Sequence, residues 1–279
     1  MVLGSNASPS SWLMALLRMN GSDIVNAKKD SVLGQIYTDL ASPSVKAIGN
    51  ALGTVFEYCT SFLLPLKLRN EKTKATFEHN LNEYKRKLES IPEENRCEVH
   101  PQVGTPIIDK LTYTTSEEIV DLFTSLLASA SDNRTTQFVH PSFVGLIENL
   151  SVDEARIIEY LNGKEVIEFC SFRAYSKSNS GFNTIYDHIT NIPSDVDLIY
   201  PKNVGAYLSN LVRLGFLSEP PGLFRIDKTA YNRIRSQYGF EQLKSRLVPS
   251  NYKSLECVEG YYRITPFGHL FISAIYPKH

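Results

Sequence analysis

The side chains best suited to chemistry are the cysteines, and their spacing assembles no local site. The four cysteines lie at least 38 residues apart, so the chain has no C-x-x-C pair of the kind that binds zinc. Cys97 and His100 have ligand spacing, but no second pair accompanies them. We therefore favour reduced, mostly buried thiols over a metal site or a disulfide scaffold. The cysteines are Cys59, Cys97, Cys170 and Cys257.

The histidines and carboxylates give no stronger signal for catalysis. His140 precedes Pro141 at an expected helix start, where we favour a capping or packing role over titration near neutral pH. Asp195 and Asp197 could pair on Mg²⁺, but the sequence shows no third ligand. Phosphate-binding glycine loops, zinc-protease motifs and nucleophile elbows are absent from the sequence. We expect a protein that is not an enzyme and uses no metal or cofactor.

Basic residues near the C-terminal end could instead contact phosphates or an acidic partner. The chain of 279 residues has a net charge of -1, which excludes a protein coated in positive charge. That total divides unevenly, because residues 1–110 carry +1, residues 111–200 carry -8 and residues 201–279 carry +6. The candidate contacts for nucleic acid or a protein partner are Lys202, Asn203, Asn210, Arg213, Arg225, Arg233 and Arg235.

The elements that must position these residues resemble a winged helix-turn-helix. Residues 203–214 have the apolar spacing of an amphipathic helix, and Gly215 follows where a helix should stop. An extended Phe216–Leu217 segment, an excursion and an alternating strand at residues 261–265 complete the order. The excursion is too long for a simple wing, so we expect an insertion near residues 220–260, with a helix over residues 227–247.

Three successive helices are expected before this region. Capping-box spacing at Thr115 and Glu118, and again at Ser151 and Glu154, marks the start of two of them. Between these two, a helix is expected to begin near His140. Residues 166–172 could form a strand, and residues 176–181 read as a loop.

The N-terminal third also reads as helical. Residues 47–66 contain Glu57 as their one formal charge, and we favour a buried helix over a membrane segment because several polar side chains interrupt the stretch. Its candidate helix-packing or membrane residues are Gly49, Gly53, Phe56 and Phe62. A charged helix follows over residues 67–90. Its apolar stripe, with spacings of 4, 3, 4 and 3 from Phe77 to Ile91, suits docking on the same chain more often than a dimer seam.

Four ordered strings resemble the bacterial Abi-alpha family, named for abortive infection, over roughly residues 35–275. They are DLASPSVKAIGNALG (39–53), SIPEEN (90–95), a helical stretch running from DLFTSLLASASD to VHPSFVGLIENL and SVDEA, and YLSNLVRLGFL (207–217) paired with ITPFGHLFI (264–272). The resemblance implies antiviral defence, helical N-terminal architecture and a winged-helix-like end. It brings no catalytic residue set.

The expected fold is mainly α, with a helical N-terminal region followed by a winged-helix-like C-terminal region with a small β-wing (α+β). The expected parts are an extension with an amphipathic helix (1–34), a helical Abi-alpha-like region (35–150) and a winged-helix-like region (151–279). We expect an anti-phage defence protein that acts without catalysis through a protein partner or a phage-derived trigger. The alternatives are a winged-helix DNA-binding regulator and a membrane-perturbing effector using the 47–66 helix, and a homo-oligomer stays open. The expected location is the cytoplasm. In the membrane-effector alternative, the protein would associate with the membrane when it is active.

Overall fold

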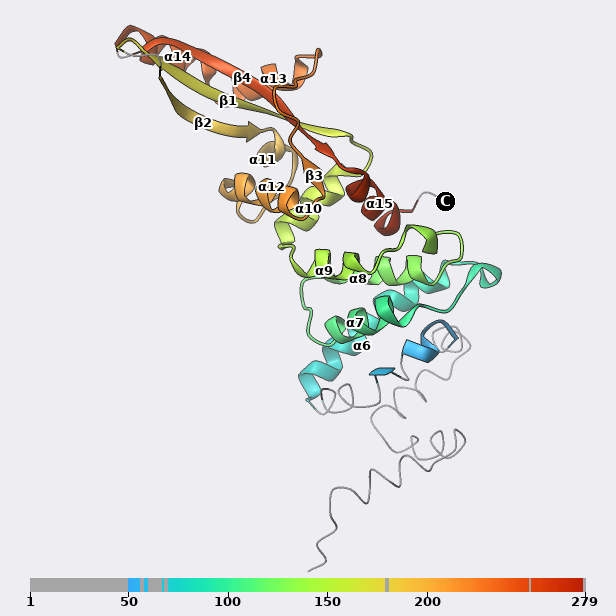
Figure 1. The fold of residues 1–279 in the computed structure, drawn as a ribbon. Helices are drawn as coiled ribbons and strands as arrows, with labels where there is room; N and C mark the ends of the chain where they lie inside the picture. The colour runs from blue at the N-terminus through green and yellow to red at the C-terminus, as the bar shows by residue number, and fades with distance from the viewer. Residues whose placement is uncertain are drawn as a thin grey trace, which may run out of the picture. The chain divides into compact units, whose positions relative to one another are not determined.

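The computed structural model describes residues 50–55, 58–59, 67, 70–178, 181–250 and 252–277, and the chain divides into two units between Tyr113 and Thr114 (Figure 1). The expected N-terminal extension, most of the 47–66 segment and the candidates Gly49, Phe56 and Phe62 lie outside the described residues. Within the described part of the chain, every helix falls short of the length and apolar character needed to cross a bilayer.

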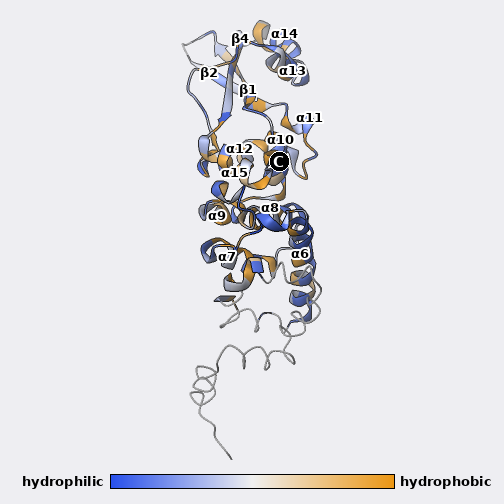
Figure 2. Ribbon diagram, turned by 90° about the vertical axis from the view of Figure 1, so that its right-hand side faces the viewer, coloured by the Kyte–Doolittle hydropathy of each residue, from blue (hydrophilic) through white to orange (hydrophobic). Residues whose placement is uncertain are grey.

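In the first unit, the expected charged helix is α6 (Glu71–Glu89). It begins at Asn70, whose side chain accepts hydrogen bonds from the N–H groups of Lys72 and Thr73, as an N-cap does. Most of its surface is hydrophilic in Figure 2, but the predicted apolar stripe is buried from Phe77 to Ile91. This confirms the expectation that the stripe docks on its own chain, because α6 packs against α7 (Pro101–Leu111).

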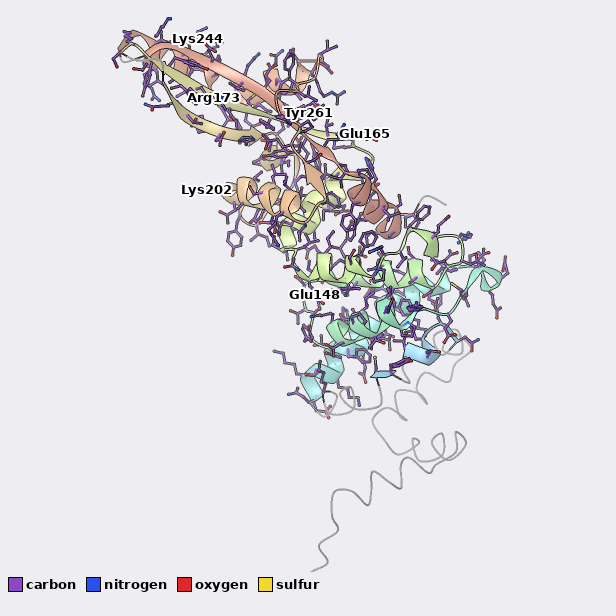
Figure 3. All side chains as sticks on the ribbon, viewed as in Figure 1. Glu148, Glu165, Arg173, Lys202, Lys244 and Tyr261 are labelled. Atoms are coloured by element: carbon purple, nitrogen blue, oxygen red, sulfur yellow. The ribbon has the colours of Figure 1, made fainter. Side chains whose placement is uncertain are left out.

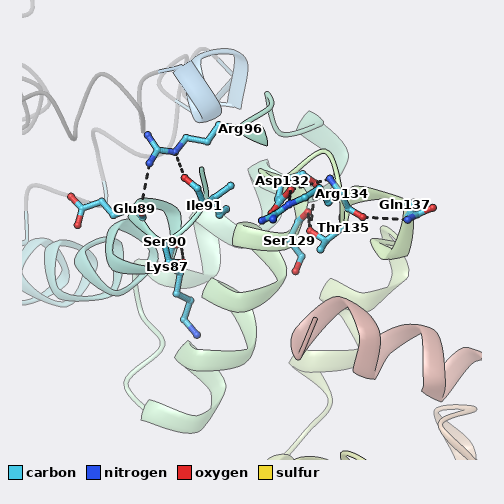
Figure 4. Close-up of polar contacts among 10 residues, drawn as sticks. All are labelled: Lys87, Glu89, Ser90, Ile91, Arg96, Ser129, Asp132, Arg134, Thr135 and Gln137. Atoms are coloured by element: carbon cyan, nitrogen blue, oxygen red, sulfur yellow. Dashed lines mark hydrogen bonds and ion pairs between the residues drawn. The ribbon is translucent and has the colours of Figure 1, made fainter. Parts of the chain in front are cut away.

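Helix α7 forms in a stretch whose prolines and glycine are typical of an irregular connection. Pro101 occupies the first turn, where the missing N–H costs no helical hydrogen bond, and the His100 ring accepts from the Gln102 N–H. Gly104 is needed for packing, because a Cβ at this position would lie 2.4 Å from Cγ2 of Val55. Between the two helices, a short 3-10 helix, η1 (Glu93–Asn95), is followed by Arg96, which donates to the Ile91 carbonyl at 2.9 Å near the end of α6 (Figure 4).

The second unit begins with the expected run of helices. Ser151 and Glu154 form the predicted capping box of α10, with hydrogen bonds in both directions. The predicted box at Thr115 and Glu118 is wrong, because Ser116 is the N-cap of α8 and its side chain makes no capping bond. Glu118 pairs with Arg156 instead. The elements of this run are α8 (Glu117–Ala130), η2 (Thr136–Phe138), α9 (Ser142–Glu148) and α10 (Val152–Leu161).

The turn between α8 and η2 is held by a buried carboxylate. Asp132 is 1% exposed, and it accepts from the Arg134 backbone N–H at 2.9 Å and from the Arg134 guanidinium at 2.6 Å (Figure 4). Thr135 donates to the Ser129 carbonyl at 2.9 Å, which closes the same turn. These bonds satisfy groups that the end of α8 would otherwise leave buried and unpaired.

A four-stranded antiparallel sheet of order β2-β1-β4-β3 follows. The strands are β1 (Val166–Ser176), β2 (Phe182–Thr190), β3 (Leu217–Ser218) and β4 (Tyr252–Ile264). The predicted strand in residues 166–172 is confirmed, but the hairpin partner β2 was not predicted. The main ladder joins β1 to β4, whereas the β3–β4 pair of the expected wing involves two residue pairs.

The stretch that was expected to be an insertion is helical, as predicted for residues 227–247, but it forms two helices. These are α13 (Thr229–Gln237) and α14 (Phe240–Ser250), separated by Gly239 with φ of +62°. Both helices pack on the β1–β4 ladder, and α14 runs along β4 (Figure 1). Their shared core consists of Cys170, Phe172, Ala174, Tyr231, Ile234, Phe240 and Leu255.

Three more helical elements lie between the strands, and one follows them. The predicted 203–214 helix is confirmed as α12 (Val204–Arg213), preceded by η3 (Pro201–Asn203), and α11 (Ile192–Asp195) comes after β2. The C-terminal helix is α15 (Pro266–Ile275), which packs against α8. The described residues are therefore mainly helical, with one small antiparallel sheet.

Candidate functional site

Helix α12 carries the first group of predicted contact residues, and a buried carboxylate fixes its position. Asp153, at the start of α10, is 2% exposed. It accepts hydrogen bonds from the Ile199 N–H at 2.7 Å, the Tyr200 N–H at 2.9 Å and the Tyr207 hydroxyl at 2.8 Å. Burial alone would raise the pKa of Asp153, but these hydrogen bonds lower it. The ionised side chain therefore ties α10 to α12 and to the segment that precedes it.

Asn210 is used inside the protein, contrary to what a base-reading role would require. Its amide nitrogen donates to the Asn149 carbonyl at 3.0 Å and to Glu154 Oε1 at 2.6 Å. Its amide oxygen accepts from Nε and Nη2 of Arg213, at 3.0 and 2.8 Å. The side chain thus links the start of α10 to the end of α12, and it holds Arg213 against the helix.

One side of α12 is buried and the other is exposed, and the exposed side carries few charges. The apolar side is buried through Val204, Leu208 and Leu211. At its start, Lys202 and Asn203 are exposed (Figure 3). We call the exposed side the α12 face; it consists of Lys202, Gly205, Ala206, Ser209, Val212 and Arg213.

Two large apolar side chains come just before η3 and α12 in the chain and were not singled out from the sequence. Ile199 and Tyr200 are 51% and 64% exposed, although their backbone N–H groups are both bound to Asp153. Their spacing within an irregular segment gives no periodic signal, so the sequence could not separate them from core residues. Exposed aromatic and aliphatic groups close in sequence to a face of small residues suit contact with another macromolecule.

The second group of predicted contact residues belongs to the insertion, and each is engaged by an acidic side chain. Arg225 lies 3.3 Å from Glu168, Arg233 lies 2.5 Å from Asp195 and Arg235 lies 2.6 Å from Glu259. Lys228 also pairs with Glu259. Glu168 and Asp195 lie outside residues 201–279, so they offset two of the six excess positive charges of that region, whereas Glu259 is already counted in the +6.

The predicted contacts belong to two stretches of the chain, residues 202–213 and residues 225–235. Lys202 lies in η3, immediately before α12, and a further basic residue, Lys244, lies on α14 at the far end of the sheet (Figure 3). Gly53, from the predicted helix-packing set, is half-buried, and a Cβ there would meet no described atom within 4 Å. The close helix approach in the first unit occurs at Gly104 instead.

A cluster around His188 brings together residue types that could suggest hydrolysis. His188 has a φ of +46°, and its ring lies between Asp187 at 2.9 Å and Glu219 at 3.0 Å. The buried Ser171 hydroxyl donates to Asp187 at 2.8 Å and accepts from the His188 backbone N–H, so it makes no bond to the imidazole. A nucleophile must be hydrogen bonded to its base, and this serine is bound to the carboxylate. The arrangement joins β2 to the end of β3 across the sheet.

Asp195 and Asp197, which were considered as a Mg²⁺ pair and not favoured, lie in different surroundings. Asp195 accepts from the Tyr160 hydroxyl at 2.8 Å and from Arg233, while the Asp197 side chain is fully exposed. Burial raises the pKa of Asp195, and the hydrogen bonds from Arg233 and Tyr160 lower it. Among the described residues, no three histidine, cysteine or acidic side chains are arranged to hold a metal ion.

Several strings that suggested the family meet in one aromatic cluster. The His140 ring packs against Phe143 in a tilted arrangement, with ring centroids 5.8 Å apart, which confirms the expected packing role, and it accepts from the Ser142 N–H at the start of α9. The ring centroid of Phe143 lies 5.2 Å from that of Phe267 and 5.1 Å from that of Phe271, both on α15. The centroids of Phe271 and Phe216 are 5.9 Å apart. The strings VHPSF, LGFL and ITPFG therefore join α9, the end of α12 and α15.

Comparison with known proteins gives two findings. A search of curated proteins finds no match. A solved structure of an uncharacterized protein from the hydrocarbon-degrading marine bacterium Alcanivorax borkumensis SK2 is 17% identical, with a TM-score of 0.31, and the likeness covers 51% of this chain and 95% of that chain.

The model of one family, abortive infection alpha, matches residues 76–275. The match includes the second, third and fourth resembling strings, and it begins after the first, at residues 39–53. It spans both the α12 face and the aromatic cluster. With most of its length matched, the chain belongs to the abortive infection alpha family.

Proposed function

We propose that this protein acts in abortive-infection defence by binding a protein partner through the α12 face, without catalysing a reaction. Its family supports the defence role. The partner is either a host protein or a protein made by the infecting phage. Ile199, Tyr200 and Val212 provide the apolar part of the contact, and Lys202 lies at one end of the face.

The observation that carries this proposal is the internal pairing of the basic residues. Arg225, Arg233 and Arg235 each contact a carboxylate of the same unit. A protein that binds a duplex neutralises several phosphates at once, so paired cations would first have to lose their intramolecular partners. Exposed aromatic and aliphatic side chains, by contrast, are the groups that anchor protein–protein contacts.

The absence of a nucleophile–base bond in the His188 cluster supports a non-enzymatic role. The Ser171 hydroxyl donates a hydrogen bond to Asp187. The residue is 1% exposed, so a substrate could not reach the hydroxyl without a rearrangement. Glu154 is engaged in a helix cap, Glu118 in an ion pair and Asp195 in a hydrogen bond from a tyrosine.

A winged-helix DNA-binding regulator is the second candidate, and one observation favours it. The order α10, α12, β3 and β4 places an exposed helix before a short antiparallel pair, with Leu217 opposite Ile264. In this alternative α12 enters the major groove and Lys202 and Arg213 contact the duplex.

Phage challenge of bacteria carrying wild-type or variant protein tests the leading proposal. Tyr200→Ala and Val212→Arg should abolish protection, because they remove the apolar anchor and introduce a charge into the contact. Tyr113→Ala serves as the matched control, since Tyr113 is also exposed, at 52%, but belongs to the other unit. Thermal melts should show that all three variants stay folded.

Capture from infected cells identifies the kind of partner. We expect wild-type protein and Tyr113→Ala to retain a protein that Val212→Arg loses. Protection that survives both face variants would contradict the proposal. A salt-dependent mobility shift on duplex DNA that Lys202→Ala weakens would establish the alternative in its place.

A further inference from the structure

Two thiols lie together on the helix-covered side of the sheet. Cys170 of β1 is opposite Glu259, and Cys257 of β4 is opposite Phe172, so the two cysteines are diagonal neighbours on the same face. Cys170 is fully buried, whereas Cys257 is half-buried at the margin of the core between the sheet and α13. Oxidants in solvent can therefore reach Cys257 before Cys170.

The surroundings of Cys257 favour its thiolate. The neighbouring Cys170 sulfur, and then the adjacent Arg235 guanidinium, lower the pKa of Cys257 against the opposing effect of burial, while the Cys170 thiol donates to the Tyr231 carbonyl. The contact with Cys257 and burial raise the pKa of Cys170. Arg235 is held in place by Glu259 and Asn232, and Lys228 lies on the far side of Glu259. One thiol is thus prepared to attack, and the other remains protonated beside it.

We propose that Cys257 is a site of oxidation by hydroperoxides, with Cys170 as the thiol that resolves the product into an intramolecular disulfide. In the first step the Cys257 thiolate attacks a peroxide oxygen and breaks the O–O bond. It becomes a sulfenic acid, and the released oxygen takes a proton and leaves as an alcohol or water.

In the second step Cys170 attacks the Cys257 sulfur. The sulfenic oxygen takes the Cys170 proton and leaves as water, and the S–S bond joins β1 to β4. The two thiols lose two electrons and the hydroperoxide gains them, so the two reaction steps balance with the thiols as reductant and the hydroperoxide as oxidant. The first cysteine reacts because it is accessible and ionised, and the second because it already contacts the first.

The register also determines how stable the product is. Diagonal neighbours on antiparallel strands are about 7–8 Å apart, beyond the usual Cα separation of a disulfide. The strands must therefore shift slightly to close the bond, which strains it. Strained disulfides are the readily reduced ones, so the pair acts as a reversible site and not as a permanent cross-link.

Peptide mapping of the full-length protein tests this proposal. Reduced protein is treated with one equivalent of hydrogen peroxide, blocked with an alkylating agent, digested and analysed by mass spectrometry. We expect a Cys170–Cys257 linked peptide, with Cys59 and Cys97 recovered as alkylated thiols. Cys59 is the internal comparator, because burial raises its pKa. Loss of the link on mild reduction should restore both thiols.

Variants separate the two steps. Cys170→Ala should leave a sulfenic acid on Cys257 that dimedone traps, and Cys257→Ser should form no linked peptide. Arg235→Ala should slow oxidation at pH 7 several-fold, because losing the guanidinium raises the pKa of Cys257 and reduces its thiolate fraction. Arg235→Lys should restore part of the rate.

Three results would overturn the proposal. The first is oxidation of Cys59 or Cys97 ahead of Cys257. The second is wild-type protein that accumulates Cys257 sulfenic or sulfinic acid without a link to Cys170. The third is a rate unchanged by Arg235→Ala in a variant whose thermal melt shows that it is folded.

Discussion

At the scale of single residues, close packing at a few positions leaves room for one residue type only. Gly268 is the clearest, because a Cβ there would lie 2.5 Å from the Phe216 carbonyl oxygen and 2.9 Å from the Ile264 side chain. Thr265 caps α15 at the same place, accepting from the Gly268 N–H and donating to the Gly215 carbonyl. The string ITPFG is therefore a structural signature, and its residues fix α15 to the turn after α12.

Gly268→Ala should lower the free energy of unfolding by about 1–3 kcal/mol, because the neighbour that must move is backbone. Gly145→Ala is the matched control, since Gly145 is exposed in α9 and has open space around it. There alanine should stabilise the helix by up to about 1 kcal/mol. Urea unfolding measures both, and equal effects of the two substitutions would refute the packing argument.

At the scale of elements, local capping signals decided some helix starts and failed at others. The Ser151–Glu154 box is formed, and Glu154 additionally accepts from Asn210, so the cap of α10 also holds α12. The same spacing at Thr115 and Glu118 misled, because α8 starts at Glu117 and Glu118 turns to Arg156 of α10. Glu118 therefore forms a tertiary ion pair with Arg156 and is not available for the capping box.

Ser151→Ala should cost about 1 kcal/mol of stability, the usual effect of removing a helix N-cap. Ser116→Ala should change stability by less than about 0.5 kcal/mol, because the Ser116 side chain makes no capping bond. Thermal and urea unfolding of the two variants provide the measurement. A larger loss at Ser116 than at Ser151 would mean that α8 and α10 begin differently from what is described here.

At the scale of the whole molecule, ionised carboxylates join elements that are distant in sequence. Asp153 holds the segment before α12, Asp187 links β1 and β2, and Asp195 joins α10 to α13. In each case burial raises the pKa and hydrogen bonds or nearby cations lower it, with a net decrease. The pKa of Glu118 is lowered first by its hydrogen bond from Arg156.

Stability should therefore fall on acidification. A carboxylate whose pKa is lower in the folded state contributes fully above its unfolded pKa of about 4, and the contribution is lost as pH falls through the folded value. We expect a melting temperature that is nearly constant from about pH 7 to 5.5 and decreases below about pH 4. The gap between wild type and Asp153→Asn should narrow as pH falls, whereas Asp197→Asn, at a fully exposed carboxylate, should stay close to wild type. A constant gap for Asp153→Asn would contradict this linkage.

The sequence by itself determined the helices whose apolar spacing is uninterrupted, together with the family. Helices α6, α8, α10 and α12 follow from periodicity, because a helix must bury its apolar side whatever its neighbours are. The order of the resembling strings gave the family, since those strings contain packing residues such as Phe143 and Phe271.

Only the tertiary structure decided which polar residues remain available for contact. The hairpin strand β2 has irregular exposure, and α7 contains two prolines and a glycine, so neither has the pattern of a regular element. The pairing of Arg225, Arg233 and Arg235 with carboxylates depends on partners at least 24 residues away. Charge along a sequence counts cations, but burial and ion pairing in the fold determine whether they can reach a ligand. That is why the basic C-terminal end suggested DNA as an alternative, whereas the internal ion pairs are the ground on which we propose a protein partner.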